Sequence, residues 1–187
     1  MSVRILAVPG SLRAGSYNVA LARAARALAP EGVEVELYEG LGALPPYDED
    51  LDGEDAPAPV RDLRTRIAEA DAVLFVTPEY NGSVSGVLKN AIDWASRPPG
   101  GEAAIWGKTV AVAGASTGQY GALWAQQDLR RILGIAGARV IPGELPVARA
   151  QDAFDERGRL RDARIAERLR EHLAKLVAEA APVALAA

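Results

Sequence analysis

Continuous apolar runs alternate with segments in which apolar residues recur every three to four positions along nearly the whole chain. The continuous runs predict buried strands at residues 3–8, 72–77, 109–114 and 138–141. Residues 33–37 alternate apolar and acidic side chains, which is typical of an edge strand with one solvated side. The helical spacing predicts helices over residues 19–28, 60–70, 87–95, 123–136 and 165–177.

Strands that alternate with helices indicate an α/β fold, in which a parallel sheet is covered on both faces. Crossovers between parallel strands are right-handed, which leaves few strand orders. The order 2-1-3-4-5 is favoured because it places the polar second strand at one edge and the apolar first and third strands at the centre. We therefore expect one domain over residues 1–187, with a loose tail from about residue 180 to 187. In this order a ligand binds beyond the carboxyl ends of the first and third strands, where residues 9–18 and 77–86 form loops.

Composition excludes several classes of function. The 187 residues carry a formal charge of −4 without a basic cluster, which argues against a nucleic-acid partner. There is no cysteine, and a single histidine, His172, excludes a histidine-rich metal site. Residues 48–53 resemble the start of a calcium loop, but Pro59 stands where the final glutamate belongs, so no metal is expected. No apolar run approaches the roughly 20 residues of a membrane span, and no signal pattern is present, so we expect a cytoplasmic protein without a membrane partner.

The first loop reads GSLRAGSYN over Gly10–Asn18, between a strand and a helix. Backbone N–H groups in such a turn attract phosphate, Ser11 and Ser16 can donate hydrogen bonds, and Arg13 offers a planar fork. The P-loop pattern fails because Ser16 and Tyr17 stand where Lys and Ser/Thr belong, and the dinucleotide fingerprint fails as well. The loop thus suits one phosphate monoester that is not transferred, and an ordinary capped turn fits equally well.

Two further loops rich in glycine and hydroxyl side chains follow the third and fourth strands at the same predicted edge. Residues 77–86 read TPEYNGSVSG, in which Asn81 and Gly82 can adopt positive φ and Tyr80 offers an aromatic wall. Outward N–H groups of such a turn suit the edge of a flat heteroaromatic ring. Residues 114–121 read GASTGQYG. Plain turns are the alternative, but the position at the switch point favours binding.

The chain resembles the NADPH-dependent FMN reductase family, which includes chromate, azo and quinone reductases. The resemblance lies in these loops and in the segments LPPYDEDLDG (44–53), PEYNGSVSGVLKNAIDWASRP (78–98) and GASTGQYGALWAQQDLRRIL (114–133). The matching segments span most of the chain in the family's order and spacing. The resemblance implies a flavodoxin-like three-layer sandwich around a five-stranded parallel sheet. It also implies FMN as cofactor, NADPH or NADH as co-substrate and a small-molecule electron acceptor.

The resemblance assigns a role to individual positions. The FMN phosphate would be held by Ser11, Arg13, Ser16 and Asn18. The ribityl chain and the isoalloxazine ring would be lined by Pro78, Glu79, Tyr80, Asn81 and Gly82. The far side of the ring would be flanked by Ser116, Thr117, Gly118 and Gly121. Ser83 and Ser85 lie where relatives vary, so the electron acceptor stays open.

No residue pair has the pattern of a nucleophile and its base. We therefore expect no catalytic side chain, because flavin N5 carries the hydride chemistry and the protein supplies position and electrostatics. Donor and acceptor would use one place in turn, which predicts ping-pong kinetics. A non-enzymatic flavodoxin-like electron carrier is the alternative, although the chain is only mildly acidic. A scaffold that kept the fold and lost the flavin is a third hypothesis.

The resemblance also implies a homodimer or homotetramer. Trp94 and Trp124 lie on the third and fourth predicted helices, where aromatic residues serve either a core or an interface. We expect Trp94 at the interface, because the helix after the PEYNG segment packs across the dimer in relatives. His172 is expected at the boundary of the last helix, without a catalytic role.

Overall fold

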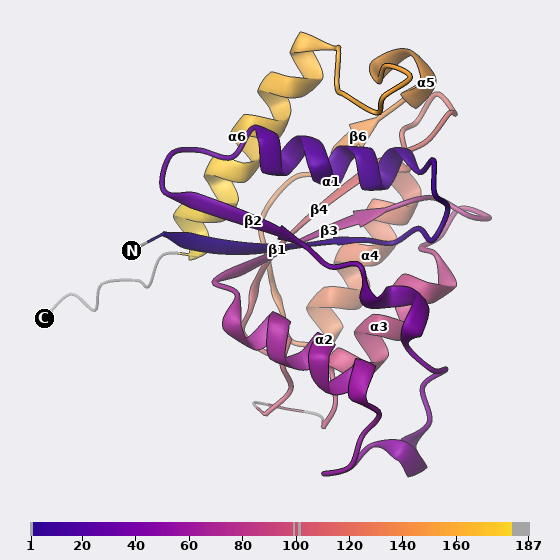
Figure 1. The fold of residues 1–187 in the computed structure, drawn as a ribbon, viewed down its shortest axis with the longest axis vertical. Coiled ribbons are helices and arrows are strands. Elements are labelled where there is room, and N and C mark those ends of the chain that lie inside the picture. The colour runs from indigo at the N-terminus through magenta and orange to yellow at the C-terminus, as the bar shows by residue number, and fades with distance from the viewer. Residues whose placement is uncertain (1, 99, 101, 181–187) are drawn as a thin grey trace, which may run out of the picture.

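The fold is a parallel sheet with helices on both faces, seen in a computed structural model that describes residues 2–98, 100 and 102–180 (Figure 1). In chain order the elements are β1 (Val3–Pro9), α1 (Tyr17–Ala27), β2 (Val33–Leu37), the 3₁₀ segments η1 (Gly40–Ala43) and η2 (Glu49–Leu51), α2 (Ala58–Glu69), β3 (Ala72–Thr77), α3 (Gly86–Ala95), β4 (Thr109–Ala115), α4 (Leu123–Ile135), β5 (Arg139–Val140), β6 (Leu145–Val147), α5 (Ala150–Ala153) and α6 (Ala163–Ala180). All the predicted strands and helices are present, with bounds shifted by a few residues.

The sheet has the order β2-β1-β3-β4-β5 with every pair parallel, which confirms the predicted α/β flavodoxin-like topology. The fifth position differs in detail, because two short strands share the outer side of β4. β5 pairs with its start and β6 with its end. Pro142 and Gly143 separate them, and Pro142 has no N–H to donate to a ladder. Neither β6 nor α5 was predicted, because three or four residues are too few to show a period.

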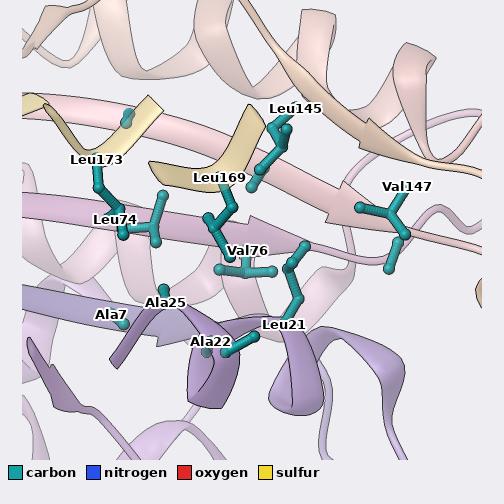
Figure 2. Close-up of a cluster of buried hydrophobic side chains, with 14 of the residues drawn as sticks. Ala7, Leu21, Ala22, Ala25, Leu74, Val76, Leu145, Val147, Leu169 and Leu173 are labelled. Atoms are coloured by element: carbon teal, nitrogen blue, oxygen red, sulfur yellow. The ribbon is translucent and has the colours of Figure 1, made fainter. Parts of the chain in front are cut away.

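Two apolar cores lie on the two faces of the sheet. Helices α1 and α6 cover one face, where Leu21 of α1 and Leu169 and Leu173 of α6 pack against Leu74 and Val76 of β3 (Figure 2). Helices α2, α3 and α4 cover the other face. Every residue of β3 and β4 is buried, as the continuous apolar runs predict. The core therefore fixes the strand ends from which the loops of the site emerge.

Trp94 belongs to the core, so its expected place at an interface was wrong. Its side chain is 0% exposed, its indole N–H donates to the Pro45 carbonyl at 2.9 Å, and its ring lies edge-on to Tyr47 at 4.8 Å. The segment between η1 and η2 folds over α3 and covers the indole within the chain. Trp124 on α4 is 49% exposed instead. Amphipathic spacing alone does not distinguish a face covered by a loop from a face left open.

His172 lies deeper than the boundary position expected for it. The ring is 6% exposed, and its Nε2 lies 2.9 Å from the Val112 carbonyl of β4. Burial lowers the pKa of His172 below its usual value, so the ring is held neutral and its Nε2–H donates to that carbonyl. The side chain is thus part of the packing between α6 and the sheet.

No helix among the described residues is both long and apolar enough to cross a lipid bilayer. Of the tail expected over residues 180–187, Ala180 is the last residue of α6, and 181–187 lie outside the described residues.

Candidate functional site

Three loops leave the carboxyl ends of adjacent strands along one edge of the sheet (Figure 1). The first loop (residues 10–16) follows β1, the second loop (residues 78–85) follows β3, and the third loop (residues 116–122) follows β4. The strand register places their starting points side by side, because β1 pairs with β3 and β3 with β4 to within one residue of their ends. The switch point between β1 and β3 therefore lies under the first two loops, as the topology predicts.

The first loop is a cluster of unused backbone donors at the start of α1. Ser16 is the N-cap residue, and its hydroxyl oxygen accepts from the N–H groups of Asn18 (3.2 Å) and Val19 (3.5 Å). Its own O–H stays available to a ligand. No described residue accepts a hydrogen bond from the backbone N–H groups of Ser11, Leu12, Ala14 and Gly15. Such donors at a helix N-terminus fit a phosphate monoester.

Arg13 and Asn18 occupy different positions relative to this loop. The Arg13 guanidinium lies 5.8 Å from the centre of the Tyr17 ring, and the arginine lines a cavity of about 230 Å³ beside the loop. The Asn18 side chain is 4% exposed and already bound. Its Nδ2 donates to the Ala115 carbonyl at 3.0 Å, and its Oδ1 accepts from the Ala115 N–H at 2.9 Å. Phosphate contact by the side chain of Asn18 stays a prediction, and this pair of bonds gives that side chain a second role.

The second loop is a tight turn. Tyr80 and Ser83 exchange two backbone hydrogen bonds of 3.1 Å, with Asn81 at φ 53° and Gly82 at φ 74° between them. The positive φ expected at both positions is confirmed, and two such residues give the twist of a primed hairpin turn. No described residue accepts from the N–H groups of Asn81 and Gly82, and Tyr80 is 54% exposed. These donors and this ring suit the edge and the face of a flat heterocycle.

The two remaining residues assigned to the second loop, Pro78 and Glu79, accept hydrogen bonds from within the chain. The carbonyl of Pro78 accepts a hydrogen bond from the Thr77 hydroxyl at 2.7 Å. The Glu79 carboxylate accepts from the Ala125 N–H at 3.1 Å, in the first turn of α4. A negative charge is stabilised there by the helix dipole, so Glu79 links the second loop to α4.

The third loop is hydrogen-bonded to the last residue of β6 and to the segment that follows it. The Ser116 N–H donates to the Val147 carbonyl at 3.1 Å, and the Arg149 N–H donates to the Gly118 carbonyl at 3.0 Å. Gly121 has φ 60°, and a Cβ there would lie 2.6 Å from the Val147 nitrogen. Gly121 is therefore required for backbone packing, whereas Thr117 and Gly118 are exposed at the rim.

Sequence reasoning missed two parts of this rim. Ser85 is 1% exposed, and its hydroxyl donates to the Gly10 carbonyl at 2.6 Å. Its only sequence signal is a serine before a helix, which normally indicates a cap. The β6–α5 segment holds the third loop and has no periodic signal.

No metal site is evident in the described part of the chain. No three carboxylate, imidazole or thiol side chains converge there. The acidic residues 48–53 form η2 and its flanks, where Asp52 pairs with Arg64 at 2.8 Å.

The residues at this edge fit FMN. The open N–H groups of the first loop match a phosphate, and those of the second loop match the carbonyls and nitrogens of a flavin ring. Exposed aromatic surface is added by Tyr80 and by the pair Tyr120 and Trp124, whose ring centres lie 4.7 Å apart.

The comparisons with known proteins agree with this geometry. The family model described as NADPH-dependent FMN reductase matches residues 3–152. An NAD(P)H-dependent FMN reductase of Pseudomonas aeruginosa is 43% identical over 93% of both chains, and a quinone reductase of Pseudomonas putida is 42% identical over 84% of both. The solved structure of FerB, a flavoenzyme NAD(P)H:(acceptor) oxidoreductase of Paracoccus denitrificans, superposes with a TM-score of 0.82 at 38% identity, over 96% of this chain and 97% of that one. This chain belongs to the NADPH-dependent FMN reductase family.

Proposed function

We propose that this protein is an FMN-dependent oxidoreductase that takes a hydride from NAD(P)H and passes it to a small acceptor of the quinone class. The observation that carries the proposal is the pair of open donor sets at one sheet edge, one in the first loop and one around Asn81 and Gly82. They are arranged for a ligand with a phosphate at one end and a polar ring at the other. Relatives named FMN reductase and quinone reductase, at 42–43% identity, support the same activity.

Bound FMN supplies the two-electron chemistry, and the chain supplies its placement. The N–H groups of the first loop and the Ser16 hydroxyl would hold its phosphate. The N–H groups of Asn81 and Gly82 would donate to the edge of its ring and favour negative charge there. The exposed ring of Tyr80 would border the place that the nicotinamide and then the acceptor would occupy in turn.

Anaerobic mixing of the FMN-loaded protein with NADPH, or with NADH, tests this function. The enzyme proposal expects rapid bleaching of the yellow flavin band and recovery of colour when a benzoquinone is added. A yellow protein that neither nucleotide bleaches would be an electron carrier. A protein that takes up no FMN would be a scaffold, and either result would refute the enzyme. Parallel double-reciprocal lines are expected when both substrates are varied.

Arg13→Ala tests where the phosphate lies. A charge-assisted hydrogen bond contributes about 1.5–3 kcal/mol, so FMN affinity is expected to fall roughly ten- to a hundredfold. Riboflavin, which lacks the phosphate, is the matched ligand and is expected to bind both forms equally. An equal loss for both flavins would contradict a phosphate contact by this side chain.

The oligomeric state and the location of the protein complete the proposal. A second copy of the chain is expected on the face formed by α3 and α4, since Ile135 (75% exposed) lines a cavity of about 520 Å³ between these helices. Ile135→Glu is expected to reduce the mass measured by light scattering from a dimer or tetramer to a monomer. Dependence on NAD(P)H suits a cytoplasmic enzyme, and cell fractionation tests that location.

A further inference from the structure

Ser85 connects the second loop to the first. It occupies the N-cap position of α3, but its hydroxyl caps no backbone N–H of that helix. It donates instead to the Gly10 carbonyl at 2.6 Å. The two segments approach closely, because a Cβ on Gly10 would lie 2.8 Å from Leu88 Cδ2 and 3.2 Å from the Ser85 hydroxyl. A serine in this position normally satisfies its own helix, so the hydroxyl serves the contact between the loops.

Two other side chains connect the remaining pairs of loops. Asn18, one residue into α1, binds both backbone groups of Ala115, the residue before the third loop. Glu79 of the second loop accepts from the Ala125 N–H, just after the third loop. Ser85 thus joins the first loop to the second, and Asn18 joins the start of α1 to the end of β4. Glu79 joins the second loop to α4, beside the hydrogen bond that the Ser83 hydroxyl donates to Asp128.

These bonds join segments that local structure does not hold together. They span 75 residues for Ser85, 97 for Asn18 and 46 for Glu79. Ser85 and Asn18 are buried, at 1% and 4% exposure, so water does not compete for their partners. A ligand that binds three separate loops must order them, and loops that are already fixed reduce that cost.

We propose that Ser85, Asn18 and Glu79 are positioning residues, which hold the three loops at the spacing FMN requires before the cofactor binds. The inference rests on the proposed function and deepens it. Ser85 acts on FMN through the Gly10 carbonyl, although the family resemblance gives it no role. Asn18 and Glu79 act through Ala115 and α4.

Ser85→Ala is the central variant, because it removes one hydroxyl and no cap. The matched control is Thr109→Val, at the opposite end of β4, where a buried hydroxyl (3% exposed) donates to the Glu179 carbonyl at 3.3 Å. One net hydrogen bond corresponds to about a fivefold change in affinity. FMN affinity, measured by flavin fluorescence quenching, is expected to fall roughly fivefold in Ser85→Ala and to stay unchanged in Thr109→Val.

A second measurement separates positioning from direct contact. Amide hydrogen exchange of the flavin-free protein is expected to speed up in the first and second loops of Ser85→Ala, and in the first and third loops of Asn18→Ala. A residue that only contacts FMN would leave exchange in the flavin-free protein unchanged. Glu79→Gln keeps an oxygen acceptor for the Ala125 N–H, so it is expected to lose less FMN affinity than Glu79→Ala, which loses affinity about fivefold.

Unchanged FMN affinity and unchanged loop exchange in Ser85→Ala would overturn the inference. So would a Glu79→Gln variant as weak as Glu79→Ala, because charge and not the hydrogen bond would then matter. The proposed function fails in a different way, in the wild-type protein. If the wild-type protein takes up no FMN, both the proposed function and this inference are refuted. If it binds FMN but NAD(P)H does not reduce that FMN, only the proposed enzyme activity is refuted.

Discussion

Replacing Trp94 with phenylalanine tests whether this indole stabilises the chain itself or an interface. The side chain is fully buried, and its N–H donates to the Pro45 carbonyl at 2.9 Å. Loss of that bond costs about 1 kcal/mol, and the space left by the smaller ring costs about 1–2 kcal/mol. Pro45 keeps a second donor, the Asn90 amide at 2.8 Å, so no buried carbonyl is left unpaired. The total loss in the free energy of unfolding is expected to be about 2–3 kcal/mol.

Urea unfolding of the flavin-free protein at fixed concentration measures this loss. For a chain of this length it corresponds to a fall in Tm of roughly 4–12 °C. Trp124→Phe is the matched control, because its ring is half exposed, and its expected change is within about 0.5 kcal/mol. Light scattering is expected to give the same oligomer mass for Trp94→Phe and wild type. A variant that dissociates while its subunit stability is unchanged would refute the burial argument.

Three further predictions concern single buried features. Tyr38→Phe removes a hydroxyl that no described residue binds, and burial of this hydroxyl raises the pKa of Tyr38 to about 12. The free energy of unfolding in urea is therefore expected to rise by about 1 kcal/mol, and a fall of that size would contradict the prediction. Burial lowers the pKa of His172 from its usual value of about 6.5, so between the native pKa and about pH 6.5 the unfolded chain binds more protons than the native one, and stability is lost as pH falls through that range. His172→Gln is expected to flatten the dependence of the urea midpoint on pH below about pH 6.5, and an unchanged slope would assign that dependence to other groups. Gly121→Ala puts a Cβ 2.6 Å from the Val147 nitrogen at φ 60° and is expected to cost at least about 2 kcal/mol, whereas Gly118→Ala, with 3.6 Å to its nearest atom, is expected to be tolerated in a thermal melt.

The sheet and most of the site's location could be predicted from the sequence, because both follow from local patterns. The unbroken apolar residues of β3 predicted a central strand, and the alternation in β2 predicted an edge. Asn81 and Gly82 predicted a turn with positive φ, and their position after a central strand placed it at the switch point. The short strand β6 was missed, since three residues carry no period.

The tertiary structure decided which partners the polar side chains found. Asn18 was indistinguishable in sequence from a phosphate ligand, and its pairing with Ala115, 97 residues away, depends on where β4 ends. Ser85 had the pattern of a cap and became a link to Gly10. Trp94 had the pattern of an outer helix face and was covered by the Pro45 segment. The sequence by itself determined the elements and the edge at which a ligand binds, because periodicity and turn chemistry act over a few residues. Only the folded chain determined which side chains face the ligand and which hold the loops, because that choice depends on contacts between distant segments.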